Sequence, residues 1–249
     1  MSDQHRTVSR LVGILEYVAG RSDGATLTEI AGQLDAARST IYGFLRGLVY
    51  EGYMDESDEG RYVFGRGANL MLLQKSEPLL HIVEPVLEDI NERFNETVTL
   101  AVDVGRSLSY IASRQSTQRI VYLPTMYSRR PLWPTSAGKI FLAAMSQGEI
   151  EQIIDDTESN AVHRELAEVR RTGFALNRGE TVADVSAIAI GIGHEGDVTA
   201  SITVGGPQAR IEPVISDLLD YMRAAVTDAG LQVWSFVEQD EPSGKAEAD

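Results

Sequence analysis

The pattern of apolar and polar positions in residues 1–66 predicts three short helices followed by a β-hairpin. Apolar residues recur at helical spacing in 8–19 and 27–34, and a third apolar stripe runs along one side of 38–51. Only residues 35–37 separate the last two segments. Two short helices joined by such a tight turn, the second polar on one face, are typical of a helix-turn-helix.

The segment that follows has the pattern of a wing. Residues 52–54 start a strand, the polar stretch 56–60 forms a turn, and the alternating residues 61–64 return as a second strand. We therefore expect a winged helix-turn-helix domain over 7–66. We expect Thr28 to be the N-cap of its second helix, because a threonine hydroxyl can accept a hydrogen bond from a first-turn amide.

The rest of the chain predicts a linker and a second domain. Residues 67–94 are mostly helical in pattern, with prolines at 78 and 85, which favours a linker helix over 67–78 and a new domain from 79. That domain, over 79–236, has the pattern of an α+β fold with a mostly antiparallel sheet. We expect 237–249 to be a disordered acidic tail. The predicted strands are 97–104, 108–113, 120–123, 185–192 and 198–204, and the predicted helices are 137–145, 148–154, 164–172 and 211–229.

The charge of the chain changes this interpretation only in part. The formal net charge is -15, and averaged over the chain this charge is unfavourable for binding phosphate backbones. The segment 36–50, however, carries Arg38 and Arg46 and no acidic residue. The predicted second helix of the helix-turn-helix therefore has the charge that DNA binding requires.

Several classes of chemistry are excluded or disfavoured. There are no cysteines, so disulfides, thiolate metal sites and cysteine nucleophiles are excluded. The histidines share no metal-ligand spacing, so we expect no metal and no cofactor. No apolar run approaches the roughly 20 residues of a membrane span, and the first ten residues do not resemble a signal peptide. We therefore expect a cytoplasmic protein without a membrane partner. The four histidines are His5, His81, His163 and His194.

The order and spacing of several short segments resemble those of the IclR family of transcriptional regulators, from about residue 7 to residue 233. The resemblance implies a winged helix joined by a helical linker to a GAF-like effector-binding domain, in a homodimer or a dimer of dimers. It implies a regulator of double-stranded operator DNA, expected here to be a repressor, that is controlled by a small organic or aromatic acid. The segments that carry it are 27–31, 38–42, Leu45, Leu48, 51–53, 130–139, 171–175, Glu180, 188–189 and 206–207.

The candidate DNA contacts lie on the second helix of the helix-turn-helix and on the wing. Hydroxyl and guanidinium groups near the start of such a helix can bind phosphates and base edges. The alternative is an ordinary solvated helix face, on which Ser39 only helps to cap the helix. The predicted contacts are Arg38, Ser39, Thr40, Tyr42, Arg46 and Arg61.

The candidate effector residues come from the resemblance, carried over position by position. Amide groups at the helix start near residues 136–138 are also suited to receive a carboxylate. Ala187 and Asn177 stand where other members often carry more polar groups, which favours a less polar ligand. The alternative is that Thr135 and Ser136 cap the helix and Trp133 belongs to the core. The predicted effector residues are Trp133, Thr135, Ser136, Ala137, Gly138, Asn177, Ala187, Thr203 and Gly205.

Two other functions are compatible with the residues. Gly43 stands where the family often has an arginine, and Asp58 and Glu59 make the wing tip acidic, which favours an effector-binding protein that has lost DNA binding. Ser136 and Lys139 spell Ser-x-x-Lys, the acylating motif of penicillin-binding enzymes. The companion motifs of that class are missing from the chain, so a serine enzyme is the weakest of the three hypotheses.

Overall fold

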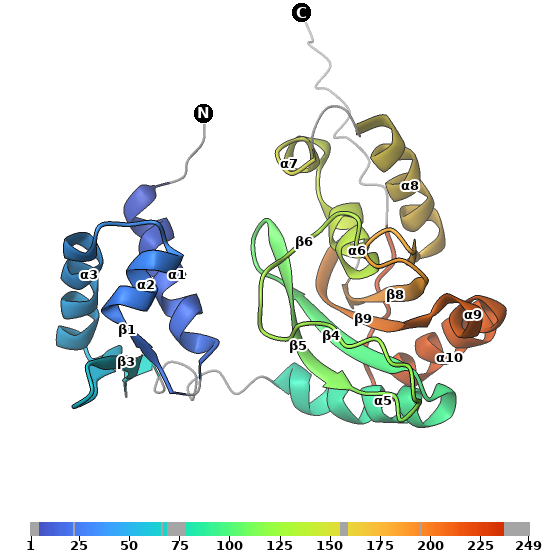
Figure 1. Cartoon of the computed structure of the whole chain (residues 1–249). Helices are drawn as coiled ribbons and strands as arrows, with labels where there is room; N and C mark the ends of the chain where they lie inside the picture. The colour runs from blue at the N-terminus through green and yellow to red at the C-terminus, as the bar shows by residue number, and fades with distance from the viewer. Residues whose placement is uncertain are drawn as a thin grey trace, which may run out of the picture. The chain divides into compact units, whose positions relative to one another are not determined.

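The computed structural model describes residues 5–21, 23–65, 67–68, 78–154, 159–194 and 196–236. The chain divides into two compact units, Met1–Pro78 and Leu79–Asp249, which are considered separately (Figure 1). Most of the predicted linker helix over 67–78 and the whole of the predicted acidic tail over 237–249 lie outside the described residues.

The first unit is a winged helix-turn-helix, as the apolar pattern predicts. Its helices are α1 (Arg6–Ala19), α2 (Leu27–Gln33) and α3 (Arg38–Tyr50). The wing strands β2 (Met54–Glu56) and β3 (Arg61–Phe64) pair antiparallel, and an unpredicted strand of two residues, β1 (Ala25–Thr26), pairs with β3. The core between these elements contains Ile14, Val18, Ile30, Ile41, Leu45, Met54 and Tyr62.

The N-cap of α2 is Thr26, and the prediction of Thr28 is wrong. The Thr26 hydroxyl accepts a hydrogen bond from the Glu29 amide, and the Glu29 carboxylate accepts one from the Thr26 amide at 2.7 Å. These bonds from Thr26 lower the pKa of the Glu29 carboxyl group. The helix therefore starts at Leu27, because this capping box satisfies the amides of its first turn.

The second unit is built on a six-stranded sheet in the order β6-β5-β4-β9-β8-β7, in which every neighbouring pair is antiparallel. This confirms the predicted α+β class. Its strands are β4 (Thr97–Asp103), β5 (Ser107–Arg114), β6 (Arg130–Pro131), β7 (Phe174–Arg178), β8 (Val185–His194) and β9 (Asp197–Pro207). Its main helices are α5 (Pro78–Phe94), α6 (Ser136–Ala144), α7 (Gln147–Glu151), α8 (Ser159–Thr172) and α10 (Ile215–Asp228).

Two of the predicted elements in this unit differ in the structure, and one strand of the structure was not predicted. Residues 120–123 form no strand, and the short strand at the edge of the sheet is β6 instead. Strand β7 was not predicted. The expected helix over 211–229 is broken into α9 (Gln208–Ile211), a 3-10 turn at Glu212–Val214 and α10. Pro213 lies in that turn, where it lacks the amide hydrogen that a continuous helix would require.

The two faces of the sheet differ in composition. Helices α5 and α10 pack on a face of large aliphatic side chains that includes Leu100, Ile188, Ile190, Ile202 and Val204, which we call the aliphatic face. Helix α6 contacts β7, β8 and β9 on the opposite face and lies inside the curl of the sheet (Figure 1). Two rows of directly paired residues cross that face, and paired residues in an antiparallel ladder point the same way. We call it the small-residue face, and its rows are Thr97–Gly205–Ala187–Asn177 and Ser113–Thr99–Thr203–Ala189–Ala175.

Candidate functional site

The exposed face of α3 carries most of the predicted DNA contacts. Ile41 and Leu45 are fully buried, so the helix is fixed against α2 by its apolar side. Arg38, Ser39 and Arg46 are exposed, and Tyr42 is 44% exposed. Thr40 is half-buried. The face presents two guanidinium groups and two hydroxyl groups without an acidic side chain, which is suited to a phosphate backbone.

The start of α3 differs from that of α2. Its N-cap residue is Ala37, and no described side chain accepts a hydrogen bond from its first turn. Helix N-termini carry unpaired amide groups and a partial positive charge, so an uncapped start beside Arg38 can bind an anion. Asp35, at φ 43°, makes the sharp turn that brings the chain into this helix.

Two glycines on the same helix have no packing role within the described chain. A Cβ atom at Gly43 or Gly47 would meet no described atom within 4 Å outside the helix backbone. Gly13 in α1 is different, because a Cβ there would lie 2.7 Å from a methyl group of Leu34. A glycine inside a helix is about 1 kcal/mol less favourable than alanine. The fold of the unit therefore gives no reason for the glycines of α3.

Arg61, the predicted contact on the wing, is held by its own domain. Its guanidinium group donates a hydrogen bond to the Gly24 carbonyl at 3.1 Å and lies 3.7 Å from the Glu29 carboxylate. These contacts join β3 to the start of α2. The contact of Arg61 with DNA stays a prediction. To reach a phosphate, its guanidinium group would have to leave the Gly24 carbonyl and the Glu29 carboxylate.

In the second unit, four of the predicted effector residues share the small-residue face. Gly205, Ala187 and Asn177 form one row, and Thr203 lies in the next row. All four are buried. The Tyr122 ring packs over this row, because a Cβ at Gly205 would lie 3.1 Å from it. The sheet register thus brings together residues from β7, β8 and β9 that are distant in the sequence.

Two buried hydroxyl groups on this face have no hydrogen-bond partner among the described residues. They are Ser113 Oγ and Thr203 Oγ1, which lie in the same row with Thr99 between them. A buried polar group without a partner costs about 1–3 kcal/mol. Their arrangement is that of a site that can offer hydrogen bonds to a small polar ligand.

Three residues that the sequence analysis did not single out lie near these predicted effector residues: Ser113, Tyr110 and Tyr122. Burial, and to a lesser extent the nearby Tyr122, raises the pKa of the Tyr110 phenol to about 12, so it stays a neutral hydrogen-bond donor. Strands β4, β8 and β9 alternate small or hydroxyl residues with branched aliphatic ones, as in Ser-Ala-Ile-Ala-Ile-Gly-Ile at 186–192. This alternation could have indicated that one face of the sheet leaves room for a ligand.

The predicted residues at the start of α6 are mostly part of its framework. The Thr135 hydroxyl accepts from the Gly138 amide and donates to the Leu132 carbonyl at 2.8 Å, so Thr135 is the N-cap. A Cβ at Gly138 would lie 1.9 Å from that carbonyl oxygen, so only glycine fits there. Ala137 is fully buried in the core below α6. Ser136 is the one polar side chain of this group for which the described structure records no hydrogen bond.

Asn177 links the sheet to the loop before α6. Its side-chain amide donates a hydrogen bond to the Pro134 carbonyl at 2.7 Å, and its carbonyl oxygen accepts one from the Thr181 hydroxyl at 3.4 Å. A ligand on the small-residue face would therefore act on the same amide that positions the start of α6.

Lys139 is bound in a buried cluster of charges and is not paired with Ser136. Its ammonium group is fully buried and donates hydrogen bonds to Glu165 and Glu180, both at 2.5 Å, and to the Leu176 carbonyl at 2.8 Å. An ammonium group has three donors and no acceptor. With all three donors used, Lys139 holds α6, α8 and β7 together and has no lone pair with which to accept the Ser136 proton.

Trp133 lies half-buried at the edge of the second unit. Its ring centroid is 5.0 Å from Lys139 Nζ, a cation–π contact, and the residue lines a groove of about 440 Å³. Arg106, Arg129 and Arg130 line the same groove. The predicted role of Trp133 as a wall of the effector site stays a prediction.

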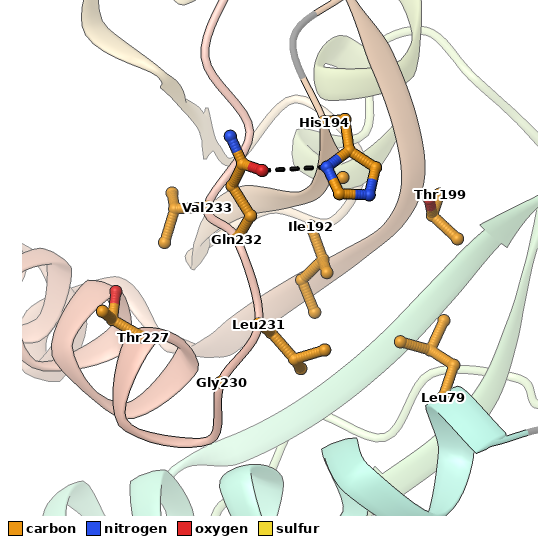
Figure 2. A pocket seen from close by; sticks show the side chains of 10 residues that line it. Leu79, Ile192, His194, Thr199, Thr227, Gly230, Leu231, Gln232 and Val233 are labelled. Atoms are coloured by element: carbon orange, nitrogen blue, oxygen red, sulfur yellow. Dashed lines mark hydrogen bonds between the residues drawn. The ribbon is translucent and has the colours of Figure 1, made fainter.

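A larger groove, of about 670 Å³, lies between the β8–β9 hairpin, the end of α10 and the first turn of α5 (Figure 2). Its walls are apolar at Leu79, Ile192 and Leu231, and His194 Nδ1 lies 2.9 Å from Gln232 Oε1 on one side. None of the predicted effector residues lines it. The described residues contain no cluster that could hold a metal ion. They also include no helix long and apolar enough to cross a bilayer.

A helix-turn-helix with an exposed basic face, in one chain with an α+β domain that has hydroxyl groups inside a curled sheet, defines a class: DNA-binding regulators with an effector domain. Comparison with known families agrees. Residues 7–56 match the IclR helix-turn-helix domain, and residues 72–234 match the bacterial transcriptional regulator IclR C-terminal domain. The chain belongs to the IclR family of bacterial transcriptional regulators.

Individual relatives support the same assignment. The transcriptional repressor IclR of Escherichia coli is 26% identical over 228 residues, which cover 84% of this chain and 82% of that protein. Among solved structures, an IclR transcriptional regulator from Silicibacter sp. TM1040 has a TM-score of 0.72 at 24% identity, covering 90% of this chain and 93% of that one. An IclR homologue from Microbacterium hydrocarbonoxydans, in complex with 4-hydroxybenzoate, has a TM-score of 0.72 at 22% identity, covering 90% and 99%. The two structures share the fold of this chain.

Proposed function

We propose that this protein is a transcriptional repressor that binds operator DNA through α3 and is controlled by a small organic acid bound on the small-residue face. We expect the acid to be aromatic, because Ala187 and Asn177 stand where other members of the family often carry more polar groups. The protein would act in the cytoplasm as a dimer or a dimer of dimers, so that two copies of α3 engage two half-sites.

The observation that carries the DNA-binding part is the exposed face of α3. It combines Arg38, Ser39 and Arg46 with an uncapped helix start, in a chain whose net charge is -15. The average charge of the chain repels nucleic acid. The basic face of α3 is a local exception, which favours DNA binding at this face. Arg38 and Arg46 would bind phosphates, and Ser39 and Tyr42 would lie against the groove.

The effector part rests on the unpartnered hydroxyl groups of Ser113 and Thr203. A carboxylate or phenol bound beside them would accept or donate the missing hydrogen bonds, and the surrounding alanines and Tyr122 would contact an apolar ring. The relative with 4-hydroxybenzoate makes that compound a suitable first probe. Because Asn177 ties this face to the loop before α6, a ligand could shift that loop between two arrangements.

The test is a selection followed by a titration. The protein is mixed with fragments of its own genome, bound fragments are recovered, and 4-hydroxybenzoate or succinate is added to the complex with the best-bound duplex. We expect a selected duplex and its release by the aromatic acid at lower concentration than by the dicarboxylate. Enrichment of no fragment would contradict DNA binding and leave effector binding as the function, whereas stronger release by succinate would contradict the aromatic ligand.

A further inference from the structure

We infer that Gly43, with Gly47 one turn later, forms a gap in the exposed face of α3 that lets this helix approach the base edges of the DNA major groove closely. The inference rests on the proposed DNA binding and goes beyond it, because it gives a role in recognition to positions that present no side chain.

The position of Gly43 carries the argument. It lies at the centre of the exposed face, between Ser39 and Gly47 along one side of the helix and next to Arg46. The opposite side is the buried stripe of Ile41 and Leu45. A helix docked by its exposed face would therefore present Gly43 directly to its partner.

Nothing inside the domain requires a glycine there. No described atom outside the helix backbone lies within 4 Å of a Cβ placed at Gly43 or at Gly47. The glycines of α1 and α6 are explained by close neighbours, Leu34 at Gly13 and Leu132 at Gly138. Gly32 in α2 and Gly148 in α7 are equally open, so openness alone assigns no partner. At Gly43 and Gly47 it coincides with the centre of the exposed basic face, where an external partner that approaches the backbone closely would compensate for the weaker helix.

The width of the DNA major groove makes such a gap important for how deeply the helix can enter. A helix with its side chains is about 10–12 Å across, and the major groove is about 12 Å wide. A side chain at the centre of the docked face therefore determines how deeply the helix enters. With glycine at 43 and 47, Ser39 and Tyr42 beside the gap can reach base edges that a bulkier face would hold out of range.

The experiment compares Gly43→Ala with a matched control, Gly32→Ala. Gly32 is exposed in the last turn of α2 and is equally open. Affinity is measured by fluorescence anisotropy on the duplex selected by the wild-type protein, and thermal melting reports folding. We expect Gly43→Ala to melt at or above the wild-type temperature and to lose about tenfold or more in affinity, the scale of one lost base contact. Gly32→Ala should bind within about twofold of wild type, the scale of a few tenths of a kcal/mol.

Four results would overturn the inference. Equal affinity of Gly43→Ala and wild type would show that no close approach occurs. An equal loss in Gly32→Ala, or a lowered melting temperature in Gly43→Ala, would assign the effect to the fold. Selection of no duplex by the wild-type protein would remove the proposed function and this inference together, whereas the first three outcomes leave DNA binding in place.

The dependence of affinity on salt distinguishes this role from a phosphate contact. Gly43→Ala removes no cation, so the slope of log affinity against log salt should equal that of wild type. A Gly43→Leu variant should lose more affinity with the same slope. A changed slope would indicate altered phosphate contacts and contradict the proposed gap.

Discussion

Helices α3 and α6 each begin directly after a turn and each carry a predicted site, yet they are built in opposite ways. Helix α3 buries one stripe and exposes its polar face, with glycines that touch no neighbour. In α6 every residue from Ser136 to Ala143 is buried, its glycine fits against a carbonyl group, and its lysine is bound on all sides. A large partner such as DNA can reach α3 directly, whereas α6 is enclosed by its own domain.

The difference predicts that equivalent substitutions have opposite effects on stability. Gly138→Ala would place a methyl group against the Leu132 backbone, so we expect a loss of about 3 kcal/mol in the free energy of unfolding, or failure to fold. Gly43→Ala should instead gain up to about 1 kcal/mol. Urea unfolding of both variants tests the comparison. A Gly138→Ala protein as stable as wild type would contradict the packing described for α6.

Disrupting the charge cluster around Lys139 should also lower the free energy of unfolding, but by less than Gly138→Ala does. Lys139→Met fills the same space but leaves Glu165 and Glu180 without their cation. Both carboxylates are 37% exposed and can be hydrated, so we expect a loss of about 2 kcal/mol, less than for a fully buried charge. The triple variant with Gln at 165 and 180 should recover part of that loss in urea unfolding. An unchanged midpoint in Lys139→Met would mean that the cluster does not hold α6 in place.

Thr203→Val should separate stability from ligand binding. The substitution removes a buried hydroxyl group that has no described partner, so the free energy of unfolding should change by less than about 1 kcal/mol. Affinity for 4-hydroxybenzoate, measured by calorimetry, should fall about fivefold, because one hydrogen bond to the ligand is lost. Ser201→Ala is a useful contrast, since the Ser201 hydroxyl already donates to the Ile190 carbonyl at 3.0 Å. Loss of stability without loss of ligand affinity in Thr203→Val would place the effector elsewhere.

Periodicity predicted the helices of the first unit and the wing, because these elements bury one side. The long strands β4, β8 and β9 are buried on both faces over most of their length, and they and β5 were indicated by their runs of apolar residues. Strand β7 was missed because Phe174 and Leu176 pack on one face of the sheet and Ala175 on the other, so its sequence shows no alternation of apolar and polar residues. Residues 120–123 were taken for a strand because an apolar run alone does not provide a pairing partner. Thr26 was missed as a cap because its reciprocal bonds with Glu29 depend on where the chain enters from β1.

The two candidate sites could also be predicted to different extents, because one lies mostly in a single helix and the other is assembled from several strands. The predicted DNA contacts lie within one helix except for Arg61, so sequence spacing alone places Ser39, Tyr42 and Arg46 on one face. The predicted effector residues on the sheet come from three strands, and only the sheet register brings Ser113 into one row with Thr203. The partners of Lys139 lie 26 and 41 residues away in the sequence, so no local pattern could indicate them.

The most direct test of the account measures DNA affinity of Arg46→Ala at two salt concentrations, beside Arg164→Ala as a control of equal charge on the exposed face of α8. We expect unchanged stability in both variants, and a loss of affinity with a shallower salt dependence only in Arg46→Ala, because one phosphate contact is removed. Equal affinities of the two variants for the selected duplex would contradict the claim that α3 is the helix that binds DNA.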